Sequence, residues 1–206
     1  MPIWQMLLTR EQAVSTSTTT KYGSVSFSEG VSNGRLDIVV LYNARSGDGL
    51  DVTPVLQEEL VLVAPRPPGL AEDPPPPPLP WPELARLPLI IPTRPNAIRM
   101  HVEAEMASHG LRPQVSLEID GVSAILDLVA DGAGCAILTR NAVAQSLKPS
   151  AYTLRPIGPP LLRIDLGVAV SSQRPTTLTQ QAALRLVQHQ LQLAIPGVPL
   201  ALSRNS

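Results

Sequence analysis

Ten prolines lie between Pro65 and Pro82, and this cluster separates the chain into two blocks. Proline lacks a backbone N–H and fixes φ, so the segment cannot form a helix or an inner strand. The sequence therefore predicts an exposed polyproline-II excursion at 65–82. Such a run could bind the aromatic groove of a partner, but an expanded surface loop is the interpretation that we favour.

The composition excludes several kinds of protein. Sixteen Lys and Arg residues oppose seventeen Asp and Glu residues, and the net charge of −1 gives no basic field that could hold nucleic acid by phosphate contacts alone. Cys135 is the single cysteine, which rules out an intramolecular disulfide and a cysteine-based zinc site. The longest apolar runs are strand-sized, as at 36–42, so we expect no membrane span. Residues 1–10 lack the features of a secretory signal, and we therefore expect a cytoplasmic protein.

Apolar strands alternate with helices along the chain. The run at 36–42 is continuously apolar, which is typical of a strand buried on both faces in a parallel sheet. Two further strands are expected at 50–56 and 58–64, separated by Gln57. Other strands are predicted at 25–29, 88–92, 114–119, 135–138, 152–157 and 164–171, and helices at 81–87, 96–109, 123–131, 141–146 and 177–193. This alternation predicts an α/β fold with mainly parallel sheets.

Several segments, taken in order, resemble the effector-binding domain of LysR-type transcriptional regulators. The sequence GRLDIVVLYN at 34–43 is similar to the signature strand of that family. Residues 50–65, LDVTPVLQEELVLVAP, resemble the strand pair that leads to the first crossing between subdomains. VSAILDLVADGAG at 122–134 resembles the helix and glycine turn of the family. The further similar segments are 83–92, 110–113, 163–171 and 174–179.

The resemblance implies the fold of type 2 periplasmic binding proteins, in which two α/β subdomains are joined by two crossings and hold a small ligand. The crossings would lie near 62–65 and 162–167. Subdomain I would comprise 24–64 and 166–195. The remaining expected parts are subdomain II at 65–165 with the proline-rich loop 65–82, a disordered or non-native N-terminus at 1–23, and a tail at 196–206.

The sequence also differs from the family pattern. Neither a helix-turn-helix nor a long linker helix precedes the resemblance, and the first strand and helix of subdomain I are not recognisable. We therefore expect a truncated or excised regulatory domain with an incomplete subdomain I. In that case DNA would be contacted only through a domain that this sequence does not contain.

The loop Thr93-Arg94-Pro95-Asn96 is the strongest candidate for an effector site. Asn96 can cap the helix that follows, and the free N–H groups and dipole at a helix start favour an anion. Arg94 supplies a guanidinium that suits a carboxylate. Ligands of α/β proteins are bound at such strand ends, and the resemblance places effector contacts in the same loop. The alternative is a capped helix with an exposed arginine.

Ser123 and Asn43 are two further candidates for effector contact. Ser123 stands at the start of a predicted helix, where it could donate to a ligand or cap the helix. Asn43 ends the strand at 36–42, on an edge that borders the ligand cleft in the family. For Asn43 a plain strand-ending turn is the favoured interpretation.

Catalysis and metal binding find little support in the sequence. His101, Glu105 and His109 are spaced four apart on one helix face, but a metal needs three or four converging ligands. Their neighbours Arg99 and Glu103 favour a solvated charged face instead. Cys135 is expected to be an inert thiol in an apolar strand, and no nucleophile elbow, phosphate-binding loop or zinc-protease motif is present. We therefore expect no enzyme, no metal and no cofactor.

The leading hypothesis is a regulatory domain of a LysR-type transcription factor that senses a small, anionic metabolite. The resemblance implies a homo-oligomer, and no membrane partner is expected. Two alternatives stay open: a solute-binding protein of a transport system with the same fold, and an inactive truncated fragment. The transport alternative would be favoured by a secretory signal and a lysine-rich surface, and the sequence shows neither.

Overall fold

The computed structural model describes residues 30–31, 36–47, 49–67, 69, 76–195 and 198–199. The expected N-terminal segment 1–23, the strand at 25–29 and most of the tail lie outside the described residues. The chain forms two compact units. Unit 1 comprises Met1–Gln57 with Asp165–Ser206, and unit 2 comprises Glu58–Ile164.

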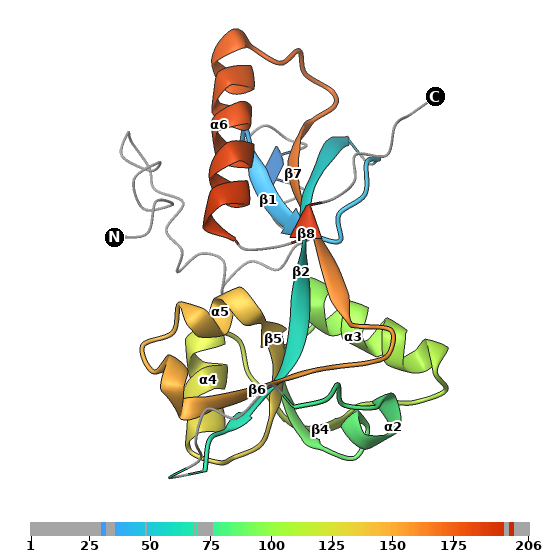
Figure 1. Ribbon diagram of the computed structural model, residues 1–206. Coiled ribbons are helices and arrows are strands. Elements are labelled where there is room, and N and C mark those ends of the chain that lie inside the picture. The colour runs from blue at the N-terminus through green and yellow to red at the C-terminus, as the bar shows by residue number, and fades with distance from the viewer. Residues whose placement is uncertain are drawn as a thin grey trace. The chain divides into compact units, whose positions relative to one another are not determined.

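Unit 1 is a sheet accompanied by one long helix (Figure 1). Its strands are β1 (Val39–Tyr42), the first part of β2 (Leu50–Pro65), β7 (Arg163–Ser171) from Asp165 onward, and β8 (Val198–Pro199). Their order is β1-β7-β2, with β8 also paired to β2. The helix α6 (Leu178–Ala194) is capped by Thr177, whose side chain accepts a hydrogen bond from the Gln180 N–H. Its apolar side chains pack on a cluster formed by Val55, Leu56, Leu166 and Val168.

Two features of unit 1 differ from the sequence-based expectation. β1 is not buried on both faces, because Leu41 is buried whereas the neighbouring Val40 is 40% exposed. β2 is one continuous strand of 16 residues and is not interrupted at Gln57. Gln57 is half-buried, pairs with Val198 in the ladder, and donates its side-chain N–H to Asp165, so the strand accommodates this polar residue. The two units divide within β2 after Gln57, earlier in the chain than the expected crossing at 62–65.

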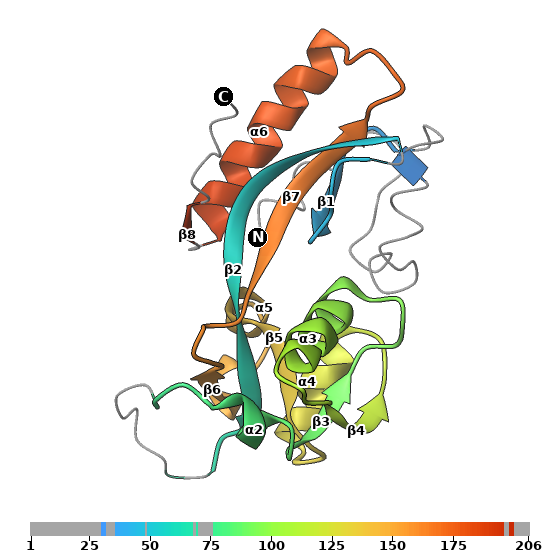
Figure 2. The same cartoon turned by 90° about the vertical axis from the view of Figure 1, so that its right-hand side faces the viewer.

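Unit 2 contains two groups of strands and most of the helices (Figure 2). The second part of β2 pairs with β5 (Ala136–Thr139) and β6 (Tyr152–Pro156), while β3 (Pro88–Ile91) pairs with β4 (Gln114–Glu118). The helices are α2 (Trp81–Leu84), α3 (Ala97–Ser108), α4 (Val122–Ala130), α5 (Arg140–Ala144) and the 3-10 helix η2 (Pro149–Ala151). The core of the unit joins β2, β3, β5 and α4 through Val61, Val63, Ile90, Leu126, Val129 and Leu138.

The prediction of mainly parallel sheets is wrong. β1 pairs with β7 in the antiparallel sense, and β2 pairs with β5, β6 and β8 in the same sense. Among the described ladders between named strands, β3–β4 is parallel. Apolar runs report burial and not direction, and strands that pair here are far apart in the sequence, so local pattern could not reveal their orientation.

The proline-rich segment is exposed over a shorter stretch than expected. Pro65 is the last residue of β2 and pairs with Tyr152. Residues 76–78 are exposed, but Leu79 is 3% exposed and its N–H donates to the Pro156 carbonyl at 2.7 Å. Residues 70–75 lie outside the described part of the chain. The described end of the loop is therefore anchored on unit 2, and α2 begins directly after it with a proline in its first turn, as predicted.

Candidate functional site

The strands β3 and β4 end side by side, and each is followed by a helix. Ile91 pairs with Glu118 in the parallel ladder, and the Ile119 N–H donates to the Ile91 carbonyl at 3.0 Å. Residues 92–96 then lead into α3, and residues 119–121 lead into α4. Both helices consequently begin at the same edge of the sheet, the carboxyl end of parallel strands, where α/β proteins bind ligands.

One pair of hydrogen bonds ties the two connecting loops together. The backbone N–H of Thr93 donates to Oδ1 of Asp120 at 2.9 Å, and the Thr93 hydroxyl donates to Oδ2 of the same carboxylate. The predicted loop residue Thr93 therefore lies against the turn that precedes Ser123. Its hydroxyl is engaged by the chain's own aspartate.

Asn96 caps α3 as the sequence predicts. Its backbone is extended, with φ −139° and ψ 130°, and its side-chain oxygen accepts from the Arg99 N–H at 3.0 Å. The first N–H groups of a helix have no partner inside the helix, so Ala97 and Ile98 present their amides at this end. Together with the helix dipole, these amides favour a negatively charged ligand atom.

The start of α4 has a different design. Its cap is Gly121, with φ 99° and ψ 118° and no side-chain capping bond. Ser123 is exposed and stands inside the first turn, so the expectation that it could cap the helix is wrong. A backbone with this φ favours glycine, and Gly121 therefore occupies the cap position. Ligand contact by Ser123 stays a prediction.

Arg94 stands at the solvent side of the loop. Its side chain is 65% exposed and pairs through Nη2 with Oε2 of Glu103 at 2.7 Å. Arg94, Pro95, Met100 and Glu103 line a shallow surface hollow. The structure therefore brings the predicted residues 93–96 together at the start of α3, with a carboxylate directly beside the arginine.

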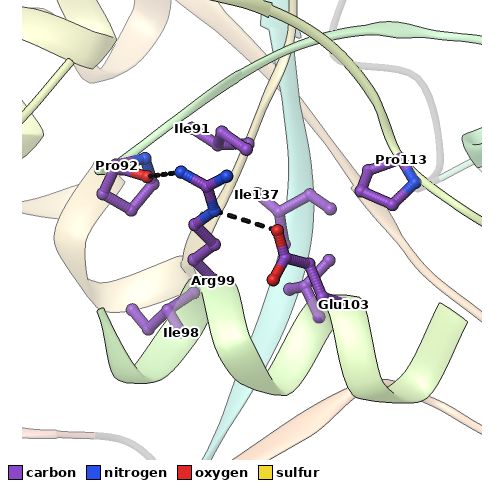
Figure 3. Close-up of a pocket in the computed structure, with 8 residues that line it drawn as sticks. Ile91, Pro92, Ile98, Arg99, Glu103, Pro113 and Ile137 are labelled. Atoms are coloured by element: carbon purple, nitrogen blue, oxygen red, sulfur yellow. Dashed lines mark hydrogen bonds and ion pairs between the residues drawn. The ribbon is translucent and has the colours of Figure 1, made fainter. Parts of the chain in front are cut away.

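Arg99 is the main residue that sequence reasoning missed. Figure 3 shows it on the same side of α3 as Glu103, with its guanidinium directed at Pro92. Its side chain is only 7% exposed, and it bonds to Glu103 at 2.9 Å, to the Pro92 carbonyl at 2.9 Å and to Glu118 at 3.0 Å. The predicted solvated charged face is wrong for this residue.

The hydrogen bonds of Arg99 also shift the pKa values of Arg99 itself and of Glu118. The hydrogen bond that Arg99 donates to Glu118 raises the pKa of Arg99 against the opposing effect of burial, and the bond to Glu103 raises it further. The pKa of Glu118 is lowered in turn, chiefly by its hydrogen bond with Arg99.

The i,i+4 spacing of Arg99 and Glu103 was the sequence signal that could have revealed this ion pair. Glu118 becomes a neighbour only because β4 pairs with β3.

Asn43 belongs to unit 1, whereas Thr93, Arg94, Pro95, Asn96 and Ser123 belong to unit 2. It follows β1 with a positive φ of 48°. Its N–H donates to the Asp165 carbonyl at 2.9 Å, and its side-chain oxygen accepts from the Asp165 N–H at 3.1 Å. This geometry confirms a strand-ending turn. A contact of Asn43 with an effector stays a prediction.

The comparisons with known proteins point to one family. The family model described as LysR substrate binding domain matches residues 16–192, which is most of the chain. The chain belongs to this family. The resemblance drawn from the sequence is thereby confirmed.

Similar proteins support the assignment of the LysR domain. The nitrogen assimilation regulatory protein nac of Klebsiella aerogenes is 24% identical over 155 residues, which are 75% of this chain and 48% of the relative. The chain thus spans about half the length of this curated relative. The C-terminal domain of a probable LysR family regulator from Rhodococcus sp. RHA1 has a TM-score of 0.66 and 19% identity, with 81% of this chain and 80% of that chain covered.

A second solved structure is the regulatory domain of CcmR from Synechocystis PCC6803, in complex with 2-PG. It has a TM-score of 0.69 and 20% identity, and the match covers 81% of this chain and 79% of that chain. The effector binding domain of QuiR, in complex with shikimate, has a TM-score of 0.66 and 16% identity and covers 80% and 78%. These likenesses confirm the predicted α/β fold of the LysR regulatory domains.

His101 in α3 and His109 at its C-cap both make local contacts in the LysR domain. Nε2 of His101 lies 2.6 Å from the Arg163 carbonyl, and the ring of His109 stacks on Trp81 with the centroids 4.7 Å apart. No group of three or more His, Cys, Asp or Glu side chains is placed to hold a metal ion within the described residues. Burial raises the pKa of the Cys135 thiol, which disfavours the reactive thiolate.

Within the part of the chain that the structure describes, no helix is both long and apolar enough to cross a membrane.

Proposed function

We propose that unit 2 of this LysR domain recognises a small effector carrying a carboxylate, at the start of α3 and α4. In the regulator that contains the domain, this binding controls transcription. The proposal is supported by the family match and by the effector complexes of the similar CcmR and QuiR domains. It includes the predicted contacts at residues 93–96 and Ser123, whereas the predicted contact of Asn43, which belongs to unit 1, is not part of this site.

The observation that carries the proposal is the junction of the two loops by Thr93 and Asp120. The β3–β4 ladder places two helix starts at one sheet edge within unit 2, and this junction ties their loops together. The amides of Ala97 and Ile98, the guanidinium of Arg94 and the hydroxyl of Ser123 are the donors available there. Backbone amides at a helix start and a guanidinium fork are the groups that bind carboxylates in proteins.

The domain would act by binding and not by catalysis. A ligand shifts a conformational equilibrium only by its difference in affinity for the two states, which is commonly about 1–3 kcal/mol. In this proposal that difference is passed to a homo-oligomer and to DNA bound by a separate domain, in the cytoplasm. The two subdomains of this proposal are units 1 and 2, which divide within β2 after Gln57.

A thermal-shift screen of the purified chain against small carboxylic and amino acids tests the proposal. A ligand that binds only the native state must raise the Tm, and at concentrations well above Kd the gain in stability grows with the logarithm of the ligand concentration over Kd. Arg94→Ala and Ser123→Ala should reduce the shift produced by a hit. Arg140→Ala is the matched control, because Arg140 is also an exposed arginine with one carboxylate partner, Glu59. A hit whose shift is unchanged in Arg94→Ala and Ser123→Ala would contradict this site.

A further inference from the structure

Arg94, the cationic group that should attract an effector, already pairs with a carboxylate of the same chain, Glu103. Nη2 of Arg94 lies 2.7 Å from Oε2 of Glu103. The Glu103 side chain is 20% exposed, and both residues line the same surface hollow. A guanidinium carries five N–H donors in a fixed fork. A ligand carboxylate that takes the fork of Arg94 must therefore share it with Glu103 or replace it.

Glu103 is placed so that it can give up Arg94 at little cost. Its other oxygen, Oε1, accepts from Nε of Arg99 at 2.9 Å. Arg99 is itself buried and held by the Pro92 carbonyl and by Glu118. Glu103 would consequently retain a cationic partner after release from Arg94, and no carboxylate would be left unpaired. Arg94 has no such fixed support, since its side chain is 65% exposed.

We propose that Glu103 is an internal competitor of the effector at Arg94 and sets the affinity of the site. This inference rests on the proposed function, because it needs Arg94 to be a ligand contact. The chain's own carboxylate occupies the arginine when no effector is bound. An effector replaces it, while Glu103 keeps its bond to Arg99. An anion must compete with one carboxylate oxygen of Glu103 for Arg94. The site therefore favours ligands whose acceptor atoms bind a guanidinium more strongly than that oxygen, and it disfavours weak monovalent anions.

The expected size of the effect follows from the strength of such pairs. Exposed ion pairs contribute about 0.2–1 kcal/mol in double-mutant cycles, which corresponds to a change in binding of up to about fivefold. Removal of the competing charge should therefore tighten anion binding by about two- to fivefold. If Glu103 instead held Arg94 in a productive position, its removal would weaken binding, so the sign distinguishes the two roles.

Inorganic sulfate is a suitable probe, and NMR of the ¹⁵N-labelled full chain reads the site directly. The amide signals of Ala97 and Ile98 and the side-chain signal of Arg94 are followed during a sulfate titration. Glu103→Gln should lower the apparent Kd for sulfate about two- to fivefold relative to the unaltered chain. Glu59→Gln is the matched control, because it removes the carboxylate of the separate Arg140–Glu59 pair, and it should leave the Kd unchanged.

A double variant separates competition from a general change of charge. Loss of a negative charge anywhere nearby attracts anions whether or not Arg94 is present. Competition requires that the gain from Glu103→Gln disappear when Arg94→Ala is combined with it. A gain that persists in the double variant overturns the inference, as does an unchanged or weaker affinity in Glu103→Gln alone. Sulfate that moves neither amide in any variant would instead contradict the anion site of the proposed function.

Discussion

The starts of α3 and α4 lie at one edge of the same parallel strand pair, yet the two are built differently. α3 is defined by side chains: Asn96 caps it, and Arg99 ties its first turn to the strand end at Pro92. α4 is defined by backbone: Gly121 adopts φ 99°, and no side chain caps the helix. One helix start thus carries its own charged partners, while the other offers amides and the exposed Ser123. An effector bound between them would meet competition mainly on the α3 side.

Removal of Arg99 should have the largest effect on this comparison. Arg99→Met leaves the Pro92 carbonyl, Glu103 and Glu118 without their buried donor. We expect a loss of about 2–3 kcal/mol in the free energy of unfolding, below the usual cost of breaking a fully buried pair because both carboxylates remain partly hydrated. Urea denaturation at pH 7 measures it. Arg140→Met, which breaks the more exposed pair with Glu59, should cost less than about 1 kcal/mol. Equal costs would contradict the anchoring role of Arg99.

Substitution of Gly121 tests the backbone design of α4. Its φ of 99° with ψ of 118° lies outside the regions that L-residues adopt readily. Gly121→Ala should therefore destabilise the chain by about 1–2 kcal/mol. Gly110→Ala is the comparison, because Gly110 has a φ of 71° and nothing would lie within 4 Å of an added Cβ. Urea denaturation should give a smaller cost there, and the reverse order would show that backbone conformation does not define the start of α4.

Substitution of Asn96 and Ser123, the polar residues at the starts of α3 and α4, should have the smallest effects and sharpen the contrast between these two helix starts. Asn96→Ala removes the cap of α3 and should cost about 1 kcal/mol. Thr177→Ala removes the cap of α6, where Oγ1 accepts from the Gln180 N–H at 3.1 Å, and should cost a similar amount. Ser123→Ala should lie within about 0.5 kcal/mol of zero. The same denaturation curves compare all three variants, and a cost for Ser123→Ala equal to that of Asn96→Ala would mean that Ser123 stabilises α4.

Much of the fold and part of the candidate site could be predicted because they depend on neighbours in the sequence. The Asn96 cap involves a residue three positions away, and the order of strands and helices follows local hydrophobic pattern. The start and end of α3 and α4 were predicted to within a residue or two for the same reason. The prediction that the 93–96 loop contacts an effector came from the helix start and Arg94 together with the family resemblance, and it stays a prediction.

The errors involve partners that are distant in the sequence. The sequence predicts a solvated face for Arg99, whereas the β3–β4 ladder brings Glu118, 19 residues away, beside it. Gln57 was expected to end a strand, but Asp165 and the partners of β2 keep it within one. The direction of the strands was also misjudged, since the burial of an apolar run is the same in parallel and antiparallel sheets.

The sequence by itself determined the family, the α/β class and the position of the loop at 93–96, because periodicity, capping and motif order are properties of residues close together in the chain. Only the tertiary structure decided which carboxylates neutralise Arg94 and Arg99, and how the two helix starts are joined through Thr93 and Asp120. Ion pairs and strand ladders act over a few ångströms in space, and the fold alone sets those distances.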